Sequence, residues 1–326
     1  MEIRINKYYL FLIFLLLTLI SHQIISERSI TNNELLRIEI QESILSGNME
    51  PPYQYRIMEP LSGYILEPVV SVFAHNKVTR HVYSHKIALF ITLFGIFFFM
   101  YKYLSLFFSD IISLFGLFLL QILIPLGITS IWESGDYFNL LFFLIALMLI
   151  FKRKEKYIPF LIAIATLNRD QSVFITVILA AFLYDRKVLF EKKNILLIIA
   201  CVAGYAVAYF SMRLYFGFKI NPYTISHETS TNITHWFSIA MLWSKQVFIY
   251  VIFSILAFKK SPVFFKWSFI SLFVYVVFFF FNSIMSQLAK FLPAYLIMIP
   301  MTLQLLSGER MKYFAADSTD KTKPAA

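Results

Sequence analysis

Acidic, basic and aromatic side chains gather just after the first apolar segment of this 326-residue chain, between residues 34 and 61. Glu34, Arg56 and Glu59 lie in this stretch. A carboxylate can take a proton from an attacking hydroxyl, and an arginine can hold a departing phosphate. A second polar group, residues 168 to 171, interrupts two short apolar runs, where ionisable side chains are costly and usually functional. The two groups together predict proton transfer and anion binding.

The rest of the chain has the composition of a membrane protein. Hydrophobic residues make up 59% of it and charged residues 15%, and the mean hydropathy is +0.70. This leaves too little polar surface to cover a water-soluble globule. The net charge of +10 comes from short clusters between apolar runs, so it indicates topology and predicts no nucleic acid partner. The single cysteine, Cys201, excludes an intrachain disulfide.

The hydropathy pattern predicts an all-α, polytopic helical bundle with about ten spans. Six apolar runs have the usual length of a span: Tyr8 to Ile25, Ile87 to Leu104, Ile111 to Ile128, Asn194 to Tyr215, Phe237 to Phe258 and Trp267 to Phe281. Four are shorter: Phe138 to Phe151, Tyr157 to Leu167, Ser172 to Tyr184 and Phe291 to Leu306. Short spans survive where protein covers them or where they line a wet cavity. The transmembrane domain is expected to cover residues 1–314, followed by a disordered tail at 315–326.

Basic clusters set the expected orientation, because Lys and Arg in short loops stay in the cytoplasm. They place both termini inside and make residues 26–86 the first extracytoplasmic loop of a multi-pass inner or plasma membrane protein. Within that loop, Gly63 to Ala74 is too short to span and is expected to form an interfacial helix. The first apolar segment lacks a small-residue cleavage pattern, which favours a retained anchor over a signal peptide.

Two further polar groups have simpler interpretations. His75, His81 and His85 recur at irregular gaps among basic residues, which does not fit a metal site and favours a solvated or headgroup-facing patch. Glu133 and Asp136 could hold a ligand, but capping of a helix by Asp136 is the cheaper explanation. The sequence therefore predicts neither a metal nor a cofactor.

Four segments, in order, resemble elements of the GT-C superfamily of integral-membrane glycosyltransferases. The first, Asn33 to Asn48, resembles the acidic residue and short interfacial helix that follow the first span of that superfamily. Tyr55-Arg56 with Pro60 resembles a Tyr-Arg and Pro element, and Asn168 to Gln171 resembles an Asn-Arg-Glu break between two helices. Ser286 to Pro293 resembles a late Glu-x-Arg element, with Gln287 and Lys290 in place of the acid and the arginine.

This resemblance implies a sugar donor linked to polyprenyl phosphate and a glycan or lipid acceptor in the cell envelope, both reached from the membrane. It implies that Glu34 is the catalytic base. It also implies that the substrates are bound by Arg56, Glu59, Asn168, Arg169, Asp170 and Lys290. Each of these residues also has a structural interpretation, as a helix cap, a loop salt bridge or a solvated charge.

Two other functions remain open from the sequence. A glycan polymerase or ligase would share the architecture and the cations but would use a polyprenyl-diphosphate donor. A transporter or flippase would move a lipid-linked sugar without forming a bond, and would be expected to show ionisable residues near the middle of the membrane and internal repeats. Lys245 is the clearest such ionisable residue, and no repeat is evident.

Overall fold

A computed structural model describes residues 5–127 and 130–313, so the expected tail at 315–326 lies outside the described residues. Within these ranges the chain is helical and contains no strand, as the sequence predicts. The first seven α-helices are α1 Lys7–Ser29, α2 Glu34–Leu45, α3 Met58–Val70, α4 Lys77–Leu104, α5 Asp110–Leu126, α6 Gly135–Phe151 and α7 Ile158–Thr166. The others are α8 Phe174–Asp185, α9 Lys192–Phe216, α10 Ile225–Thr234, α11 Trp236–Gln246, α12 Phe248–Ala257, α13 Val263–Asn282 and α14 Leu292–Ser307.

Six described helical segments are long and apolar enough to cross a bilayer, and a bent pair brings the number to seven. Two of them, Ile131–Phe151 and Leu288–Ser307, are longer than the sequence suggested because a short 3-10 turn precedes each α-helix. In contrast, α7 has 9 residues and α8 has 12, both below the usual length of a span. The long apolar helices indicate a membrane protein, and the expected count of ten spans is not established.

The expected span from Phe237 to Phe258 is two helices, α11 and α12, bent by 60° at Val247. The break contains no proline or glycine. Polar anchors hold the end of α11 in place. Trp243 donates to the carbonyl of Met285 at 2.9 Å, and Gln246 donates to the carbonyl of Leu126 at 3.2 Å.

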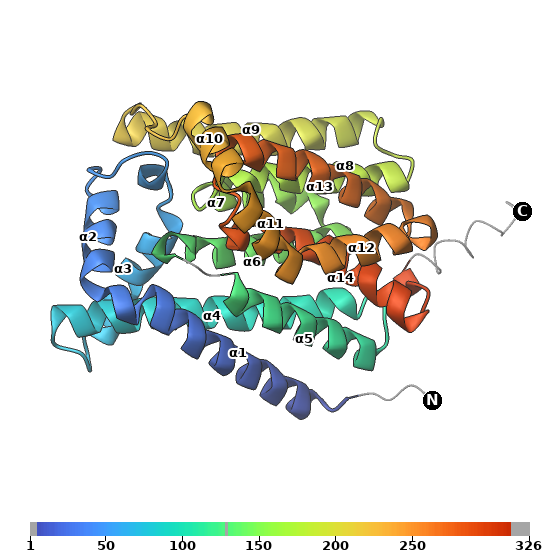
Figure 1. The fold of residues 1–326 in the computed structure, drawn as a ribbon, viewed down its shortest axis with the longest axis horizontal. Helices are drawn as coiled ribbons and strands as arrows, with labels where there is room; N and C mark the ends of the chain where they lie inside the picture. The colour runs from blue at the N-terminus through green and yellow to red at the C-terminus, as the bar shows by residue number, and fades with distance from the viewer. Residues whose placement is uncertain (1–4, 128–129, 314–326) are drawn as a thin grey trace, which may run out of the picture.

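The helices lie side by side in a bundle, and their ends gather at two opposite ends of the molecule (Figure 1). One end holds residues 104–110, 151–157, 185–192, 257–263 and 307–313; we call it the basic end because most of the Lys and Arg clusters lie there. The chain enters and leaves at this end. The amide of Ile5 donates to Asp110 at 3.3 Å, and the amide of Lys312 donates to the carbonyl of Phe107 at 2.9 Å.

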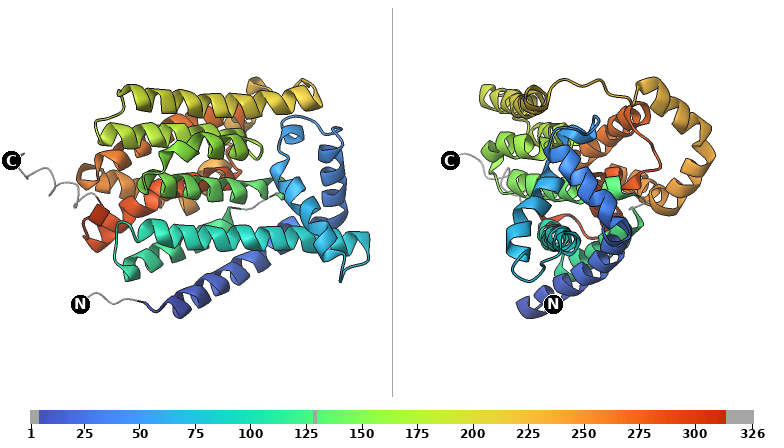
Figure 2. Two further views of the ribbon diagram at one scale, coloured as in Figure 1. Left: turned by 180° about the vertical axis from the view of Figure 1, so that it is seen from behind. Right: turned by 90° about the vertical axis from the view of Figure 1, so that its left-hand side faces the viewer.

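The opposite end is covered by α2 and α3, which lie across the bundle in the right-hand view of Figure 2; we call it the α2–α3 end. Both helices are short, with 12 and 13 residues. The helix that follows them, α4, begins at Lys77, about three turns before its apolar run, because Asn76 accepts a hydrogen bond from the amide of Val78. Residues 77–86, which the sequence assigns to the first loop, are therefore helical.

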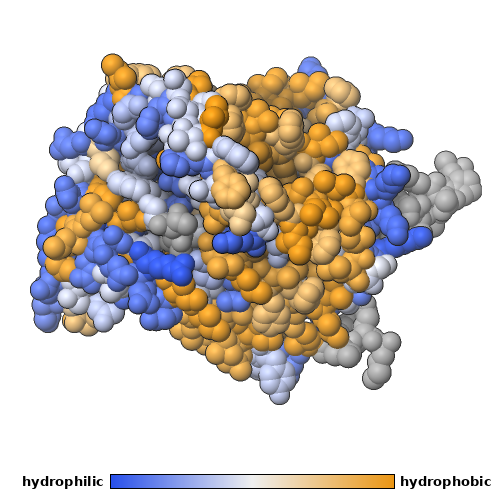
Figure 3. Space-filling view, viewed as in Figure 1, coloured by the Kyte–Doolittle hydropathy of each residue, from blue (hydrophilic) through white to orange (hydrophobic). Residues whose placement is uncertain are grey.

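Apolar residues dominate the middle of the face shown in Figure 3, and hydrophilic residues gather toward its two ends. The core between the ends is built from large side chains that are fully buried, such as Phe97 on α4, Tyr137 on α6 and Phe182 on α8. This distribution is typical of a helical bundle whose middle faces lipid and whose two ends face water. The polar groups of the α2–α3 end are consequently held between a hydrophobic bundle and two covering helices.

Candidate functional site

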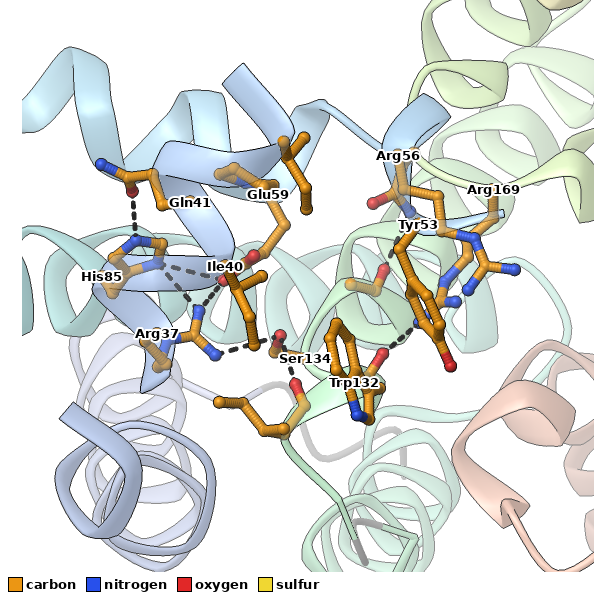
Figure 4. A pocket seen from close by; sticks show the side chains of 15 residues that line it. Arg37, Ile40, Gln41, Tyr53, Arg56, Glu59, His85, Trp132, Ser134 and Arg169 are labelled. Atoms are coloured by element: carbon orange, nitrogen blue, oxygen red, sulfur yellow. Dashed lines mark hydrogen bonds and ion pairs between the residues drawn. The ribbon is translucent and has the colours of Figure 1, made fainter. Parts of the chain in front are cut away.

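A polar cavity with a volume of about 40 Å³ lies beneath α2 and α3 (Figure 4). Its walls come from five parts of the chain: α2, residues 53 to 60, α4, residues 131 to 135 around the start of α6, and the break between α7 and α8. We call it the arginine pocket, because three arginines line it: Arg37, Arg56 and Arg169. Of the site residues that the sequence predicts, Arg56, Glu59, Asn168 and Arg169 all line this pocket.

One side of the pocket is an ion pair between Arg37 of α2 and Glu59 at the start of α3. Arg37 is 5% exposed, and it also donates to the carbonyl of Ser29 at 3.2 Å. His85 of α4 joins the pair, with its Nδ1 3.0 Å from both the Arg37 guanidinium and the Glu59 carboxylate. Glu59 thus pairs with Arg37, in place of the loop salt bridge with Arg56 that the sequence left open.

The charges around Glu59 keep it ionised although it is largely buried. Burial by itself raises the pKa of this carboxyl group. Attraction to Arg37, together with attraction and a hydrogen bond to His85, outweighs burial and holds the pKa well below its usual range. Glu59 is the only carboxylate among the described residues that line this pocket.

A chain of hydrogen bonds leads from Glu59 away from the pocket. The far nitrogen of His85, Nε2, lies 2.7 Å from the Gln41 side-chain oxygen, and the Gln41 amide donates to Glu67 at 2.9 Å. Glu67 in turn lies 3.4 Å from Nδ1 of His81. His81 and His85 are 2% and 3% exposed, so interpreting them as a solvated patch is wrong. They lie four residues apart on the buried face of α4, which places both under the covering helices.

The other side of the pocket is organised by Arg169, which is 4% exposed. Its guanidinium donates to the carbonyl of Trp132 at 2.6 Å and to the Asp136 carboxylate at 3.1 Å. Asn168 donates to the carbonyl of Gly135 at 2.8 Å. The α7–α8 break is thus fastened to the first turn of α6. Asp136 serves as the buried partner of Arg169, whereas the sequence favoured a helix-capping role for it.

Aromatic rings separate the two sides of the pocket. The rings of Tyr53 and Trp132 lie 4.2 Å apart between centroids, and the Arg56 guanidinium lies 5.2 Å from the Tyr53 ring (Figure 4). Burial lowers the pKa of Arg56 to about 10, and repulsion from Arg169 acts in the same direction. Burial raises the pKa of Tyr53 above its ordinary value. Arg56 therefore stays charged at neutral pH in a setting that disfavours its charge.

Lys290 approaches the same group of charges from the turn before α14. Its ammonium group donates to the hydroxyl of Ser283, and its backbone carbonyl accepts from Tyr275 at 2.6 Å. The Tyr275 hydroxyl also lies 3.1 Å from the side-chain oxygen of Gln171, which places the turn before α14 beside the α7–α8 break. The element from Ser286 to Pro293 thus lies at the α2–α3 end, as the first loop does.

Three of the expected residues lie outside the pocket wall: Lys290, Glu34 and Asp170. Glu34 begins α2, is half-buried, and lies three residues before Arg37, so the predicted base does not line the arginine pocket. Asp170 starts the turn before α8 and is also half-buried, and its charge acts on Arg56 through space. Arg37, three residues after Glu34 on α2, pairs with Glu59.

Three guanidinium groups in the pocket each have an unused donor. Among the described residues, the buried Nε–H groups of Arg37, Arg56 and Arg169 have no hydrogen-bond partner. A buried donor left unsatisfied costs about 1–3 kcal/mol. Three such donors around one cavity are suited to an anion, because charged oxygens make the strongest hydrogen bonds with guanidinium groups. The described residues contain no group of His, Cys, Asp and Glu that could hold a metal ion.

Sequence reasoning missed Arg37, Gln41 and His85 as members of the site. A signal for them exists in the spacing: Arg37, Gln41 and Ile44 recur every three to four residues along α2 and share its buried face. His85 continues the buried face of α4 in the same way. Polar residues that recur with the helical period in a short helix indicate a buried polar network, and the amino-acid sequence alone contains that pattern.

Comparisons of this chain with protein-family models, with curated proteins and with solved structures found no match. Its function is therefore inferred from the geometry of the arginine pocket and from the resemblance of the four sequence elements.

Proposed function

We propose that this chain is an integral-membrane glycosyltransferase that moves a sugar from a polyprenyl-phosphate donor to a glycan or lipid acceptor of the cell envelope. The observation that carries the proposal is the set of three arginines whose buried Nε–H groups have no partner within the described residues, around one cavity at a bundle end. A lipid-linked donor keeps its tail in the bilayer and its phosphate at the rim. A cationic pocket beneath two covering helices is suited to that phosphate.

The size of the pocket favours a single phosphate. A water molecule needs roughly 10–15 Å³ of such volume, so a cavity of about 40 Å³ holds about three waters. One phosphate group fits this space better than two do. The polyprenyl-monophosphate donor is therefore preferred over the diphosphate donor of a polymerase or ligase.

In the proposed reaction the acceptor hydroxyl oxygen forms a bond to the anomeric carbon as the bond from that carbon to the phosphate oxygen breaks. The electron pair leaves with the polyprenyl phosphate, and a carboxylate takes the hydroxyl proton. Arg56, Arg169 and Lys290 stabilise the negative charge on the leaving phosphate. Glu34 is the base that the sequence predicts. Glu59 lines the pocket and is ionised, so it is the second candidate, although its lowered pKa makes it a weaker base.

The test compares these two carboxylates directly. Wild type, Glu59→Gln and Glu34→Gln are reconstituted in vesicles with a radiolabelled polyprenyl-phosphate sugar and membrane acceptor. Loss of a general base lowers turnover by roughly 10²–10⁴-fold, and we expect this loss in one of the two variants. Glu39→Gln, which removes an exposed carboxylate from α2, is the matched control. Unchanged turnover in both Glu59→Gln and Glu34→Gln would remove the proposed base.

Assays with different donors distinguish the proposed transferase from a polymerase or ligase and from a transporter. Product from a polyprenyl-diphosphate donor, with none from the monophosphate, would identify a polymerase or ligase. Movement of labelled lipid-linked sugar across the vesicle membrane without a new glycosidic bond would identify a transporter.

Arg56→Met and Lys290→Met test phosphate binding, and each is expected to raise the donor KM by about tenfold, the effect of about 1.4 kcal/mol.

A further inference from the structure

A second cavity lies beside the arginine pocket, on the other side of the Gln41 side chain. Its volume is about 560 Å³, and it is formed by α2, α3 and the start of α4. We call it the outer groove; its polar lining includes Glu42, Ser46, Tyr64, Glu67, Lys77 and His81. Cavities that take small ligands measure roughly 300–1,000 Å³, and the outer groove falls within this range.

A buried nitrogen in the groove wall has no partner. His81 is 2% exposed, and its Nε2 makes no hydrogen bond within the described part of the chain. Its other nitrogen, Nδ1, lies 3.4 Å from the Glu67 carboxylate, which can only accept, so the ring proton belongs on Nδ1. Nε2 then carries a lone pair. A ligand that donates a hydrogen bond would satisfy this nitrogen once the side chains that enclose it move aside.

The other groups in the wall narrow the chemistry of that ligand. Glu67 and Glu42 supply further acceptors, and their negative charge repels an anion. Both carboxylates already face cations, Glu42 in an ion pair with Lys77 and Glu67 with Arg80 at 3.9 Å, so the groove does not call for a cationic ligand. The remaining possibility is a neutral ligand rich in hydroxyl groups.

An exposed aromatic ring completes the lining. Tyr64 of α3 is 56% exposed and borders the groove, as do the apolar side chains of Ile38, Leu45 and Leu61. A ring face next to carboxylate and imidazole acceptors suits a sugar, which has apolar C–H faces and hydroxyl donors around its rim. We propose that the outer groove is a binding site for a short, uncharged glycan.

Hydrogen bonds connect this site to the arginine pocket. Gln41 lines both cavities, and it links Glu67 in the groove to His85 at the pocket. That the glycan is the acceptor of the transferred sugar rests on the proposed function, whereas glycan binding itself does not. The two claims can therefore fail separately.

The probe is the pool of neutral oligosaccharides released from the envelope of the source cells and labelled with a fluorescent amine. Full-length protein in detergent is immobilised, and the retained glycans are measured without any donor. Glu42→Gln and Tyr64→Ala change exposed side chains of the groove, so both variants are expected to fold. Each is expected to reduce retention about fivefold to tenfold, the effect of one hydrogen bond or one ring contact. His81→Phe tests the unpartnered nitrogen and is expected to do the same.

Matched controls lie outside the groove. Glu39→Gln removes another exposed carboxylate of α2, and Tyr83→Ala removes an exposed tyrosine of α4. Both should retain glycans like wild type. No retention by wild type, or equal retention by wild type and by Glu42→Gln and Tyr64→Ala, would overturn the proposal. Retention without sugar transfer in the vesicle assay would contradict the proposed function and leave the glycan site standing.

Discussion

The two ends of the bundle carry the same cationic residue types in opposite environments. At the basic end, Lys152, Arg153 and Lys154 are exposed to solvent. At the α2–α3 end, Arg37 and Arg169 are 5% and 4% exposed, and each is paired with a carboxylate. Exposed charges contribute little to stability but bias the orientation in the membrane, whereas buried charges are expensive unless they are paired. Burial, and not residue type, distinguishes the cations that set the orientation in the membrane from the cations of the site.

The strongest challenge to this contrast is to remove one buried cation. Arg169→Met leaves Asp136 buried and unpaired, and we expect it to lower the free energy of unfolding by about 3–5 kcal/mol. Lys154→Met removes an exposed cation at the basic end and should change the free energy by less than about 0.5 kcal/mol. Unfolding by a denaturing detergent measures both. The double variant Arg169→Met with Asp136→Leu should recover much of the loss, because the pair is then replaced by apolar groups.

Equal effects of Arg169→Met and Lys154→Met would contradict the contrast between the two ends. The same result would show that Asp136 does not need its partner, and it would remove the structural basis of the arginine pocket.

A pH titration gives a second, smaller effect. The folded pKa of Glu59 lies below its ordinary value, so its contribution to stability is complete above the unfolded pKa, about 4.3 for a glutamate. That contribution shrinks as pH falls from there toward the folded pKa. Wild type should lose about 1.4 kcal/mol per pH unit relative to Glu59→Gln in this range. Melting curves between about pH 6 and about pH 3, a range that brackets the unfolded pKa, provide the measurement.

Glu39→Gln is the control for this titration, because Glu39 is an exposed carboxylate on the same helix as Arg37. Its stability should follow that of wild type across the same range. Parallel curves for wild type and Glu59→Gln would mean that Arg37 and His85 do not stabilise the Glu59 carboxylate in the folded protein.

The smallest effect on stability is expected from cysteine substitutions that allow each end to be labelled. Asn48 and Lys154 are exposed at opposite ends, and the natural cysteine, Cys201, is buried. Asn48→Cys and Lys154→Cys should each change stability by less than about 0.5 kcal/mol. If the basic end faces the cytoplasm, a membrane-impermeant maleimide labels Asn48→Cys in intact cells and Lys154→Cys only after lysis. The reverse pattern would put the arginine pocket on the cytoplasmic side and rule out an extracytoplasmic reaction.

Much of the architecture follows from local sequence. Apolar runs predict the helices because a bilayer or a core requires their backbones to be hydrogen-bonded internally. The exceptions arise where caps or anchors act, as at Asn76, which starts α4 early, and at Trp243, which fixes the end of α11 at the bend. Periodicity also indicates which residues of α2 face inward.

Hydropathy predicted a helical, apolar chain, and the resemblance of four elements singled out seven site residues, of which Arg56, Glu59, Asn168 and Arg169 line one cavity. The partners of the buried charges became apparent only in the folded molecule: Arg37 for Glu59, and Asp136 for Arg169. Hydropathy and helical period depend on neighbours along the chain. Ion pairs between residues 22 and 33 positions apart depend on how the helices pack, and local sequence does not encode that choice.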